Sequence, residues 1–447
     1  MLRISIGPVF IFIICFITCV QKTNAQGNAN HPECLFGKMM QERGFTHIPG
    51  NPSPSPPGWL PSQDDDSTYY VIPTVVHVIY DSIGKLTATD VSDDAVRSEI
   101  KVLNEDYGKQ YNTPGYNDYP FGVDTRIRYC LASIDPNGNP TTGIDHIYSK
   151  DYASINSNID TVSGYFLEMN TKNLSRWDQN RYLNIWVVAA VDGRSNVAGY
   201  SYLANQSAGM EYDGIVVVYL YFGDHQHYQA YPYNMGRTST HECGHYFNLY
   251  HPWGPDFSGQ NGCTDGGDSV YDTPPCAHPY YSQPVPYSHD DSCETPFECN
   301  SDYRLVEDYM DYSYDTCMDV FTLGQAQRMR AAIRTFRTEL INYTNIVTTG
   351  CRNFYLSLNP TNQDHLSVNG SITSNTLNIY PLFINSENAQ ISLSDMRGRI
   401  IVNIAYPSMQ NSPVSLPVPQ LSNGMYIITV TTNTAKYTDK VVVTGRY

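Results

Sequence analysis

The stretch HECGHYFNLYH, residues 241–251, decides the fold of this 447-residue chain. On a helix, residues four apart share one face, so His241 and His245 can direct two imidazoles at one ion. Glu242 follows the first ligand and is expected beside the metal. There it can take a proton from a metal-bound water, whose pKa the metal lowers. His251 lies too far along the helix axis to join them unless the chain turns sharply. The motif therefore predicts a zinc centre with three histidine ligands and Glu242 as base, against the alternative of an amphipathic helix with packed or solvated histidines.

Length and charge restrict the class of protein. A chain of 447 residues is too long for one ordinary domain, so two or three are expected. Its formal net charge of -17 argues against non-specific binding to nucleic acid or anionic membranes. An acidic surface is compatible with basic substrates and with bound calcium.

The first 25 residues have the pattern of a signal peptide. Arg3 gives the positive region, residues 4–20 the apolar core, and residues 23–25 a small-residue cleavage site. A lipoprotein site at Cys19 is the alternative. We therefore expect an exported protein, and no other apolar stretch is long enough to span a bilayer. Nine cysteines remain after this segment, so disulfides are expected, with at least one thiol left over.

Composition divides the rest of the chain. Residues 26–68 contain a Pro/Ser/Asp stretch typical of a pro-segment or linker. Residues 69–350 are predicted to form the zinc-protease domain, residues 351–369 a linker, and residues 370–447 a small β-sandwich of short strands broken by turns.

Within the predicted protease domain, apolar β-branched runs predict strands over 70–80, 183–191 and 214–222. Val96, Ile100, Leu103 and Tyr107 have helical spacing, with Ser92 and Asp93 available as caps. Two further helices are predicted over 237–250 and 325–340. The irregular stretch between them, residues 254–309, is rich in Gly, Pro, Asp and Cys, which indicates a segment held by disulfides.

A second motif establishes a family resemblance. The stretch HECGHYFNLYH (241–251) is similar to the metzincin signature HExxHxxGxxH. The stretch DYMDYSYDTCMDVFTLGQAQRM (308–329) is similar to the Met-turn that metzincins require, with Met310 as the turn methionine. With the DTPP run (272–275) between them, residues 70–340 resemble the pappalysin family of metalloendopeptidases, notably bacterial members of the ulilysin and cytophagalysin type. The resemblance implies an α/β fold: a twisted mixed sheet that is mostly parallel, a backing helix, an active-site helix and an irregular lower subdomain.

The signature and the Met-turn assign further roles by resemblance. Asn248 replaces the signature glycine, and asparagine tolerates the left-handed backbone of that turn better than other non-glycine residues. Tyr312 matches the Met-turn tyrosine, whose hydroxyl can stabilise an oxyanion; the alternative is one tyrosine among 37. Met310 is expected to form an apolar floor under the zinc.

Asp315 matches the base of the pocket that receives the side chain after the cut, where a carboxylate would select Arg or Lys. A surface aspartate or a calcium ligand is the alternative. Asp265, Asp268, Asp272 and the Thr273 carbonyl form an oxygen-rich cluster that suits calcium, and the family carries structural calcium nearby. A solvated acidic loop is the competing interpretation.

The cysteines are ordered partly by resemblance. Cys263 and Cys317 match family disulfide positions, with partners expected among Cys276, Cys293 and Cys299. The pairing Cys263–Cys299 with Cys293–Cys317 is predicted, and Cys130–Cys243 is a further candidate pair, with Cys243 structural rather than nucleophilic.

Cys34 lies in the predicted pro-segment, and a thiolate is a strong zinc ligand. It is a candidate latency ligand that would fill the open coordination position; the alternative is a plain disulfide, with Cys351 as one partner. Among the other histidines, His77 is expected in the core, and His225 and His227 are expected to face solvent.

Residues from about 370 onward resemble the sorting domain of type IX secretion substrates. The similar segments are LNIYP (377–381), DMRGRI (395–400), LSNGMY (421–426) and KVVV (440–443). The resemblance implies secretion machinery as a partner, and removal or cell-surface anchoring after export. An accessory sandwich that binds a surface or carbohydrate is the alternative.

These features predict a secreted zinc endopeptidase that cleaves proteins and peptides. The strand around residues 199–203 is expected to form the upper edge of the cleft, where an extended peptide adds by backbone pairing. Two alternatives stay open: a non-peptidase zinc hydrolase, and a catalytically weakened zinc-binding adhesin or binding module.

Overall fold

The computed structural model describes a large part of the chain. It covers residues 33–35, 68–81, 89–160, 166–194, 196–224, 231–254, 262–265, 267–280, 293, 299, 304–358, 366–369, 376–381, 385–410, 414–432 and 436–443. The predicted signal peptide, most of the predicted pro-segment, His225 and His227 lie outside the described residues. Among the helices of the described segments, none has both the length and the hydropathy to cross a bilayer.

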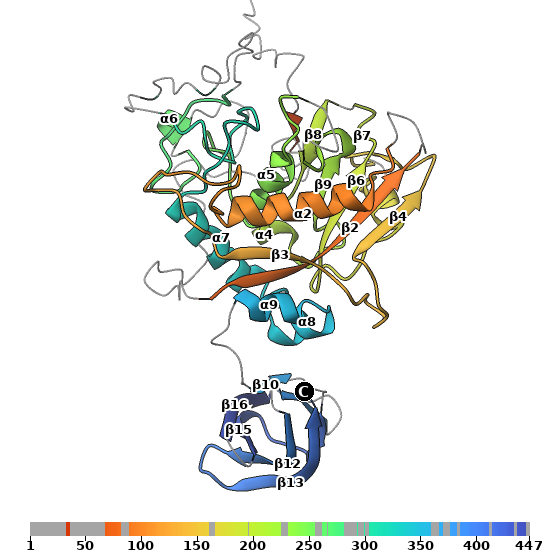
Figure 1. The fold of residues 1–447 in the computed structure, drawn as a ribbon, viewed down its shortest axis with the longest axis vertical. Helices are drawn as coiled ribbons and strands as arrows, with labels where there is room; N and C mark the ends of the chain where they lie inside the picture. Colours follow the sequence, from red (N-terminus) through yellow and green to blue (C-terminus); the bar gives the residue numbers. More distant parts are fainter. Residues whose placement is uncertain are drawn as a thin grey trace, which may run out of the picture. The chain divides into compact units, whose positions relative to one another are not determined.

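A mixed, mostly parallel sheet forms the centre of residues 69–350, the predicted protease domain (Figure 1). Strand β2 (Tyr70–Tyr80) is central and matches the predicted range, and its interior residues are all buried. It pairs in parallel with β3, β4 and β6. The near-continuous apolar sequence of β2 follows from burial on both faces, as parallel sheets require. The other strands of this sheet are β1 (Glu33–Cys34), β3 (Ile127–Leu131), β4 (Ile144–Tyr148), β6 (Leu183–Val188), β8 (Val197–Tyr200) and β9 (Ile215–Val218).

One edge of this sheet is important for the site. The strand order is β1-β8-β9-β6-β2-β3, so β8 separates β9 from β1. Strand β8 runs antiparallel to β9 and parallel to β1. The predicted strand over 214–222 ends at Val218, where a short 3-10 helix, Tyr219–Tyr221, follows. The upper edge strand ends at Tyr200, so it lies a few residues earlier than predicted.

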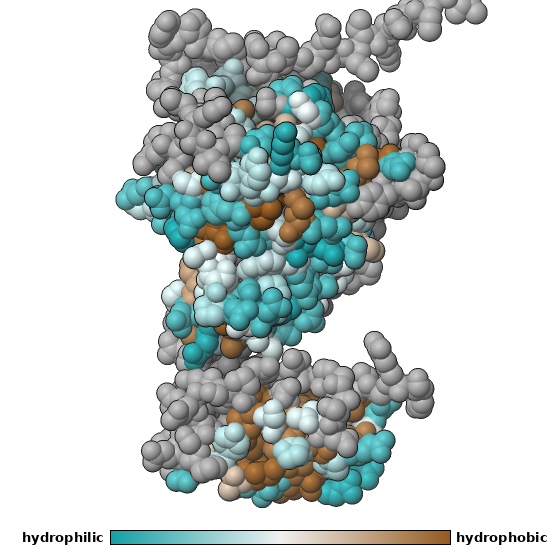
Figure 2. All heavy atoms as spheres, turned by 90° about the vertical axis from the view of Figure 1, so that its right-hand side faces the viewer, coloured by the Kyte–Doolittle hydropathy of each residue, from teal (hydrophilic) through white to brown (hydrophobic). Residues whose placement is uncertain are grey.

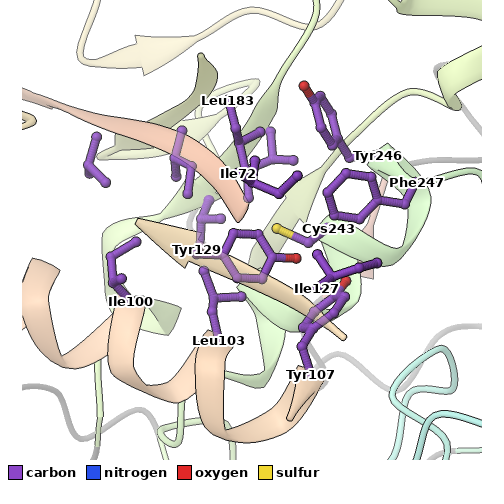
Figure 3. Close-up of a cluster of buried hydrophobic side chains, with 14 of the residues drawn as sticks. Ile72, Ile100, Leu103, Tyr107, Ile127, Tyr129, Leu183, Cys243, Tyr246 and Phe247 are labelled. Atoms are coloured by element: carbon purple, nitrogen blue, oxygen red, sulfur yellow. The ribbon is translucent and has the colours of Figure 1, made fainter. Parts of the chain in front are cut away.

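Helix α2 (Asp93–Tyr107) is the backing helix that the pattern predicts. Ser92 caps it, since its side chain accepts a hydrogen bond from the Ala95 amide. Its apolar face packs with side chains of the sheet and of α5 (Arg237–Tyr246) in one core (Figure 3). There Tyr107 contacts Tyr129 edge to face, with ring centroids 5.1 Å apart. This core fixes α5 against the sheet.

Helix α7 (Leu323–Phe336) closes the protease region and begins with a capping box between Thr322 and Gln325. It begins at Leu323, two residues before the predicted start at 325, and ends at Phe336, four residues before the predicted end at 340. The remaining elements of this region are short. They are β5 (Ser154–Ile155), β7 (Ala190–Val191), α3 (Met169–Lys172), α4 (Ala204–Ser207), α6 (Gly262–Asp265), α8 (Tyr343–Thr348) and α9 (Arg352–Leu358). Helix α9 lies within the segment predicted to be a linker.

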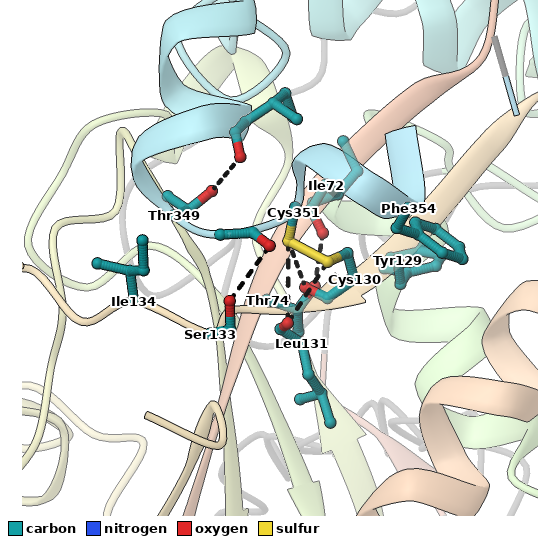
Figure 4. Close-up of a disulfide and its surroundings, with 12 residues drawn as sticks. Ile72, Thr74, Tyr129, Cys130, Leu131, Ser133, Ile134, Thr349, Cys351 and Phe354 are labelled. Carbon is teal, nitrogen blue, oxygen red and sulfur yellow. Dashed lines mark hydrogen bonds between the residues drawn. A yellow bond between two sulfur atoms is a disulfide. The ribbon is translucent and has the colours of Figure 1, made fainter. Parts of the chain in front are cut away.

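Three disulfides hold the described chain. Cys263 is bonded to Cys299 and Cys293 to Cys317, which confirms the predicted pairing. The candidate pair Cys130–Cys243 is wrong, because Cys130 is bonded to Cys351 (Figure 4). Side chains alternate along β3, so Tyr129 faces the core that contains Cys243 and Cys130 faces the other way. The bond to Cys351 also excludes the alternative pairing of Cys34 with Cys351.

The C-terminal residues form two antiparallel sheets, as the short strands predict. Alternate residues such as Ile391, Leu393, Ile428 and Val430 fill the core between them. The first strand begins at Leu366, slightly before the predicted boundary at residue 370. One sheet contains β10 (Leu366–Asn369), β11 (Thr376–Pro381) and β14 (Val414–Pro417), and the other contains β12 (Asn385–Asp395), β13 (Ile400–Gln410), β15 (Gly424–Thr431) and β16 (Lys436–Val443).

Candidate active site

Three histidine side chains converge at the C-terminal end of α5. His241 and His245 project from one face of the helix, and His251 returns to them after the chain turns. The Nε2 atom of His251 lies 3.1 Å from that of His241 and 3.1 Å from that of His245. All three side chains are buried. The structure thus brings together the three residues that the motif predicts as ligands.

Hydrogen bonds to backbone carbonyls fix which ring nitrogens face one another. His241 Nδ1 donates to the Tyr309 carbonyl and His245 Nδ1 to the Leu249 carbonyl, each at 2.8 Å. The Nε2 atoms of these neutral rings therefore carry lone pairs. Burial, with the nearby His251, lowers the pKa of His241 to about 3 and that of His245 well below its usual value. Neutral nitrogens that converge this closely suit a cation, and zinc prefers such ligands.

A left-handed residue turns the chain between the second and third histidines. Asn248 has φ 80°, the conformation that the signature glycine would adopt. The Asn248 amide donates to the His245 carbonyl at 2.8 Å, and the Asn248 carbonyl accepts from Arg328 Nε at 2.8 Å. The turn is therefore formed with asparagine in place of glycine, and α5 ends at Tyr246 rather than at the predicted residue 250.

Glu242 is buried one residue after the first histidine. Burial raises the pKa of its carboxyl to about 8, and the Cys34 side chain opposes this shift. Strand β8 passes directly over it at Gly199. A Cβ atom at Gly199 would lie 3.2 Å from the Glu242 side chain and 2.5 Å from the Val216 carbonyl oxygen. Sequence reasoning placed Gly199 in the cleft-edge strand but did not predict its contact with Glu242, because nothing local marks a glycine that makes room for a distant side chain.

The predicted Met-turn lies beneath the histidines. Met310 is buried, and its Sδ occupies the space that a side chain at Gly244 would need. The Tyr312 ring lies 5.7 Å from the His241 ring and 5.1 Å from the His251 ring, between centroids. Both residues are therefore next to the histidine cluster, where their predicted roles require them.

Two residues that the sequence did not single out support this turn. The Asp311 carboxylate accepts from the Tyr312 amide at 2.8 Å and from Arg304 Nη2 at 2.7 Å. The Trp253 ring stacks on the His251 ring, with centroids 4.4 Å apart and an interplanar angle of 13°. Both contacts join residues that are close in the chain, but residue type alone does not show how these side chains are oriented.

A pocket beside Glu242 contains Asp315 among its lining residues, together with Tyr233, Met318 and Arg237. The Asp315 carboxylate accepts a hydrogen bond from the Met235 amide at 2.7 Å. Burial raises its pKa to about 6. Arg237 lies nearby, and its guanidinium is paired with Asp106 at 2.7 Å. The structure thus places Asp315 in a pocket next to Glu242 and not on the surface.

The oxygen-rich cluster is only partly described. The Asp268 carboxylate accepts from the Val270 amide at 2.9 Å and from the Thr273 hydroxyl at 2.8 Å. The Asp272 carboxylate accepts from the Thr322 hydroxyl and the Gly324 amide, at the start of α7. The Asp265 side chain lies outside the described residues. Calcium at this cluster stays a prediction.

Cys34 lies at the histidine cluster. Its sulfur and the histidine ligand nitrogens all lie within 4.8 Å of one another. In the parallel pairing of β1 with β8, Cys34 is opposite Gly199, and the Leu35 amide donates to the Gly199 carbonyl at 3.1 Å. Residues 33–35 of the predicted pro-segment therefore lie along the edge of β8 and bring a thiol to the candidate metal centre.

His77 is the other histidine with a predicted role that the structure describes. His77 is buried in the sheet, with its ring nitrogens 3.1 Å from Asp145 Oδ2 and 2.9 Å from Asn184 Oδ1. It is a satisfied core residue, as predicted.

Comparison with protein-family models gives two matches. Residues 168–334 match the M43 peptidase family, described as pregnancy-associated plasma protein-A. Residues 372–444 match the secretion system C-terminal sorting domain.

Similar proteins extend the first match. An extracellular metalloprotease of Sordaria macrospora is 37% identical over 48% of this chain and 67% of that protein. One of Podospora anserina is 31% identical over 57% of this chain and 79% of its own. Among solved structures, mirolysin in complex with a compound is 33% identical with a TM-score of 0.50, covering 63% of this chain and 99% of that one. A promirolysin mutant of Tannerella forsythia is 29% identical with a TM-score of 0.53, covering 70% and 97%.

These findings agree with the α/β metzincin fold, the disulfides and the metal-binding motif. The protein is a secreted metalloprotease, because the peptidase family, the extracellular relatives and the sorting domain point the same way. This chain therefore belongs to the pappalysin family of metzincin metalloendopeptidases.

Proposed function

We propose that the protein hydrolyses peptide bonds with His241, His245 and His251 as zinc ligands and Glu242 as the proton carrier. The convergence of three buried Nε2 atoms beside a buried carboxylate supports this proposal most strongly. The bound zinc would supply Lewis acidity, which polarises the scissile carbonyl and lowers the pKa of the attacking water.

The residues of this chain perform the remaining steps. Glu242 takes a proton from the attacking water and delivers it to the leaving amine. Burial raises the pKa of Glu242 above its usual value, which favours its return of the proton to the leaving amine. The Tyr312 hydroxyl stabilises the oxyanion of the tetrahedral intermediate. In this structure β1 pairs with the outer edge of β8. Once β1 has left, the same edge receives the extended substrate by backbone pairing.

Substrate preference follows from Asp315 in the proposal. A buried carboxylate at a pocket beside Glu242 would select Arg or Lys after the cut, because an ion pair there excludes neutral side chains. Mapping the bonds cut in a peptide library tests activity and this preference together. Cuts before basic residues are expected, and cuts without any such preference would contradict the role of Asp315.

The pro-segment is proposed to keep the enzyme latent through Cys34. Its sulfur lies where a thiolate can occupy the fourth position around the metal. Its strand also fills the substrate's place on β8. The Tyr312 hydroxyl donates to the Cys34 carbonyl at 3.5 Å, so a second catalytic group is engaged by the same segment.

The C-terminal sandwich is proposed to direct the chain to secretion machinery, with removal or cell-surface attachment afterwards. The sorting-domain match supports this role. Hydrophobic residues gather on the face of the sandwich that Figure 2 shows. Met396, Ile400 and Met425 are exposed apolar side chains of the same sandwich. Such a face suits contact with a partner protein. Structural calcium at Asp268, Asp272 and Thr273 also stays part of the proposal.

A further inference from the structure

A buried polar network lies behind the cleft-edge strand, away from the histidines. The Glu168 carboxylate accepts hydrogen bonds from the hydroxyls of Tyr200 and Tyr202, each at 2.8 Å. The two tyrosines are two residues apart on extended chain, so their side chains lie on the same face and reach the same carboxylate. All three side chains are fully buried. The edge strand is thus attached to a carboxylate from a different segment, just before α3.

Lys172 balances the charge of this carboxylate. Its Nζ lies 2.8 Å from Glu168 Oε2 and donates to the Tyr212 carbonyl at 2.6 Å. The ammonium also lies 4.9 Å from the Trp186 ring centroid and 5.3 Å from that of Tyr200. A charge buried this deeply persists only when it is paired and hydrogen-bonded, and here both conditions are met. The network is therefore a rigid support and not an accidental contact.

The strand that it supports needs such an attachment. Strand β8 pairs with β9 at Gly199 and Tyr200 only. Its other edge pairs with β1, which belongs to the predicted pro-segment and would leave on activation. Gly199, whose carbonyl accepts a hydrogen bond from Leu35, precedes Tyr200 directly. After the pro-segment leaves, side-chain contacts must keep this carbonyl in place for the substrate.

We propose that Glu168 is a positioning residue for peptide hydrolysis, which acts through the Tyr200 and Tyr202 hydroxyls to hold the substrate-pairing edge of β8. This inference rests on the proposed pairing of substrate with β8. Glu168 touches neither substrate nor metal. Its contribution is to keep the Gly199 carbonyl fixed when one side of the strand is open.

The network gives a specific kinetic expectation. Tyr200→Phe and Tyr202→Phe remove only the two hydroxyls and leave the rings packed. Hydrogen bonds to a buried charge are among the stronger ones, so loss of both should lower kcat/KM about tenfold for a long peptide. The change should lie in KM, because the hydroxyls act on binding of the extended chain and not on the proton transfers of Glu242. A truncated peptide that does not extend along β8 should be cleaved by the variant as well as by the wild type.

The experiment compares the activated wild type with Tyr200→Phe/Tyr202→Phe on one long peptide and its truncated form. Active enzyme is titrated with a tight-binding hydroxamate inhibitor that occupies the active site, so that a smaller folded fraction does not alter the rate constants. Tyr182→Phe is the matched control, since that buried tyrosine donates to the Ile134 carbonyl at 3.0 Å and lies outside this network. Glu168→Gln is the second variant, which keeps the shape of the side chain but removes its charge.

The outcomes separate the inference from the proposed function. A higher KM for the long peptide alone, absent in Tyr182→Phe, supports the positioning role. Equal KM values for wild type and both network variants overturn it, and so does an equal loss for the long and the truncated peptide. If the wild type itself cleaves neither peptide, the proposed hydrolysis fails instead.

Discussion

Cys34 lies opposite Gly199 in the pairing of β1 with β8, and this places its sulfur among the ligand atoms of three histidines. A single residue thereby combines two ways of blocking the cleft. Its backbone occupies the strand edge that a substrate needs, and its thiol lies where the metal would be open. The proposed latency would therefore depend on the thiol as well as on the strand.

Replacing Cys34 separates these two effects. Cys34→Ala should make the unprocessed chain active on a short peptide, because a metal ligand is lost while only weak backbone pairing remains. Cys34→Ser should behave similarly, since a hydroxyl is a poor zinc ligand near neutral pH. The assay is hydrolysis by the purified precursor, with its length verified before and after. A precursor of Cys34→Ala that stays silent would reject the thiol as the latency ligand.

The preference for basic side chains should depend on pH. Burial raises the pKa of Asp315 to about 6, so its carboxyl is charged above that value and neutral below it. The ratio of kcat/KM for an Arg peptide to that for its citrulline analogue should therefore fall as the pH drops through about 6. Taking the ratio cancels ionisations that affect both substrates. Asp315→Asn should give a low ratio at every pH, and a wild-type ratio independent of pH would contradict the role of Asp315.

Asn248 should tolerate glycine but not alanine. Its φ of 80° strains any residue with an ordinary Cβ, so Asn248→Ala should lower the free energy of unfolding by about 1 kcal/mol. Asn248→Gly should stay within a few tenths of a kcal/mol of the wild type, roughly as other left-handed sites do. Urea unfolding of the two variants measures the difference. Equal stability of the alanine and glycine variants would show that the turn relaxes.

The disulfides should differ in their contribution to stability. Cys130 and Cys351 are separated by 221 residues, and Cys293 and Cys317 by 24. In the chain-entropy model the longer loop stabilises the fold by about 2 kcal/mol more. The double serine variant of the first pair should therefore unfold at lower denaturant than that of the second. The reverse order would indicate that local strain or residual structure outweighs loop length.

The sequence predicts those features that depend on local spacing. The histidine spacing, the Ser92 cap, the range of β2 and the position of Met310 all follow from periodicity or from a motif. The helix over 237–250 was predicted too long, because the left-handed residue that ends it is an asparagine, which is a weaker stop signal than glycine.

Several contacts that join distant segments were not predicted from the sequence. The partner of Cys130 depends on which face of β3 it occupies, and that is known only once the sheet is assembled. Gly199 over Glu242 and Glu168 behind Tyr200 are contacts between separate segments. Residue type gives no signal for any of them, since the physical cause is tertiary proximity.

The most direct test of the zinc-hydrolase account combines metal content with cleavage for the activated wild type and Glu242→Ala. Both proteins should bind one zinc per chain, because Glu242 is not a ligand and the three histidines are unchanged. The wild type should degrade an unstructured protein, and the variant should lose essentially all of this activity, because its proton carrier is missing. A Glu242→Ala variant that holds zinc and still cleaves at the wild-type rate would contradict the account.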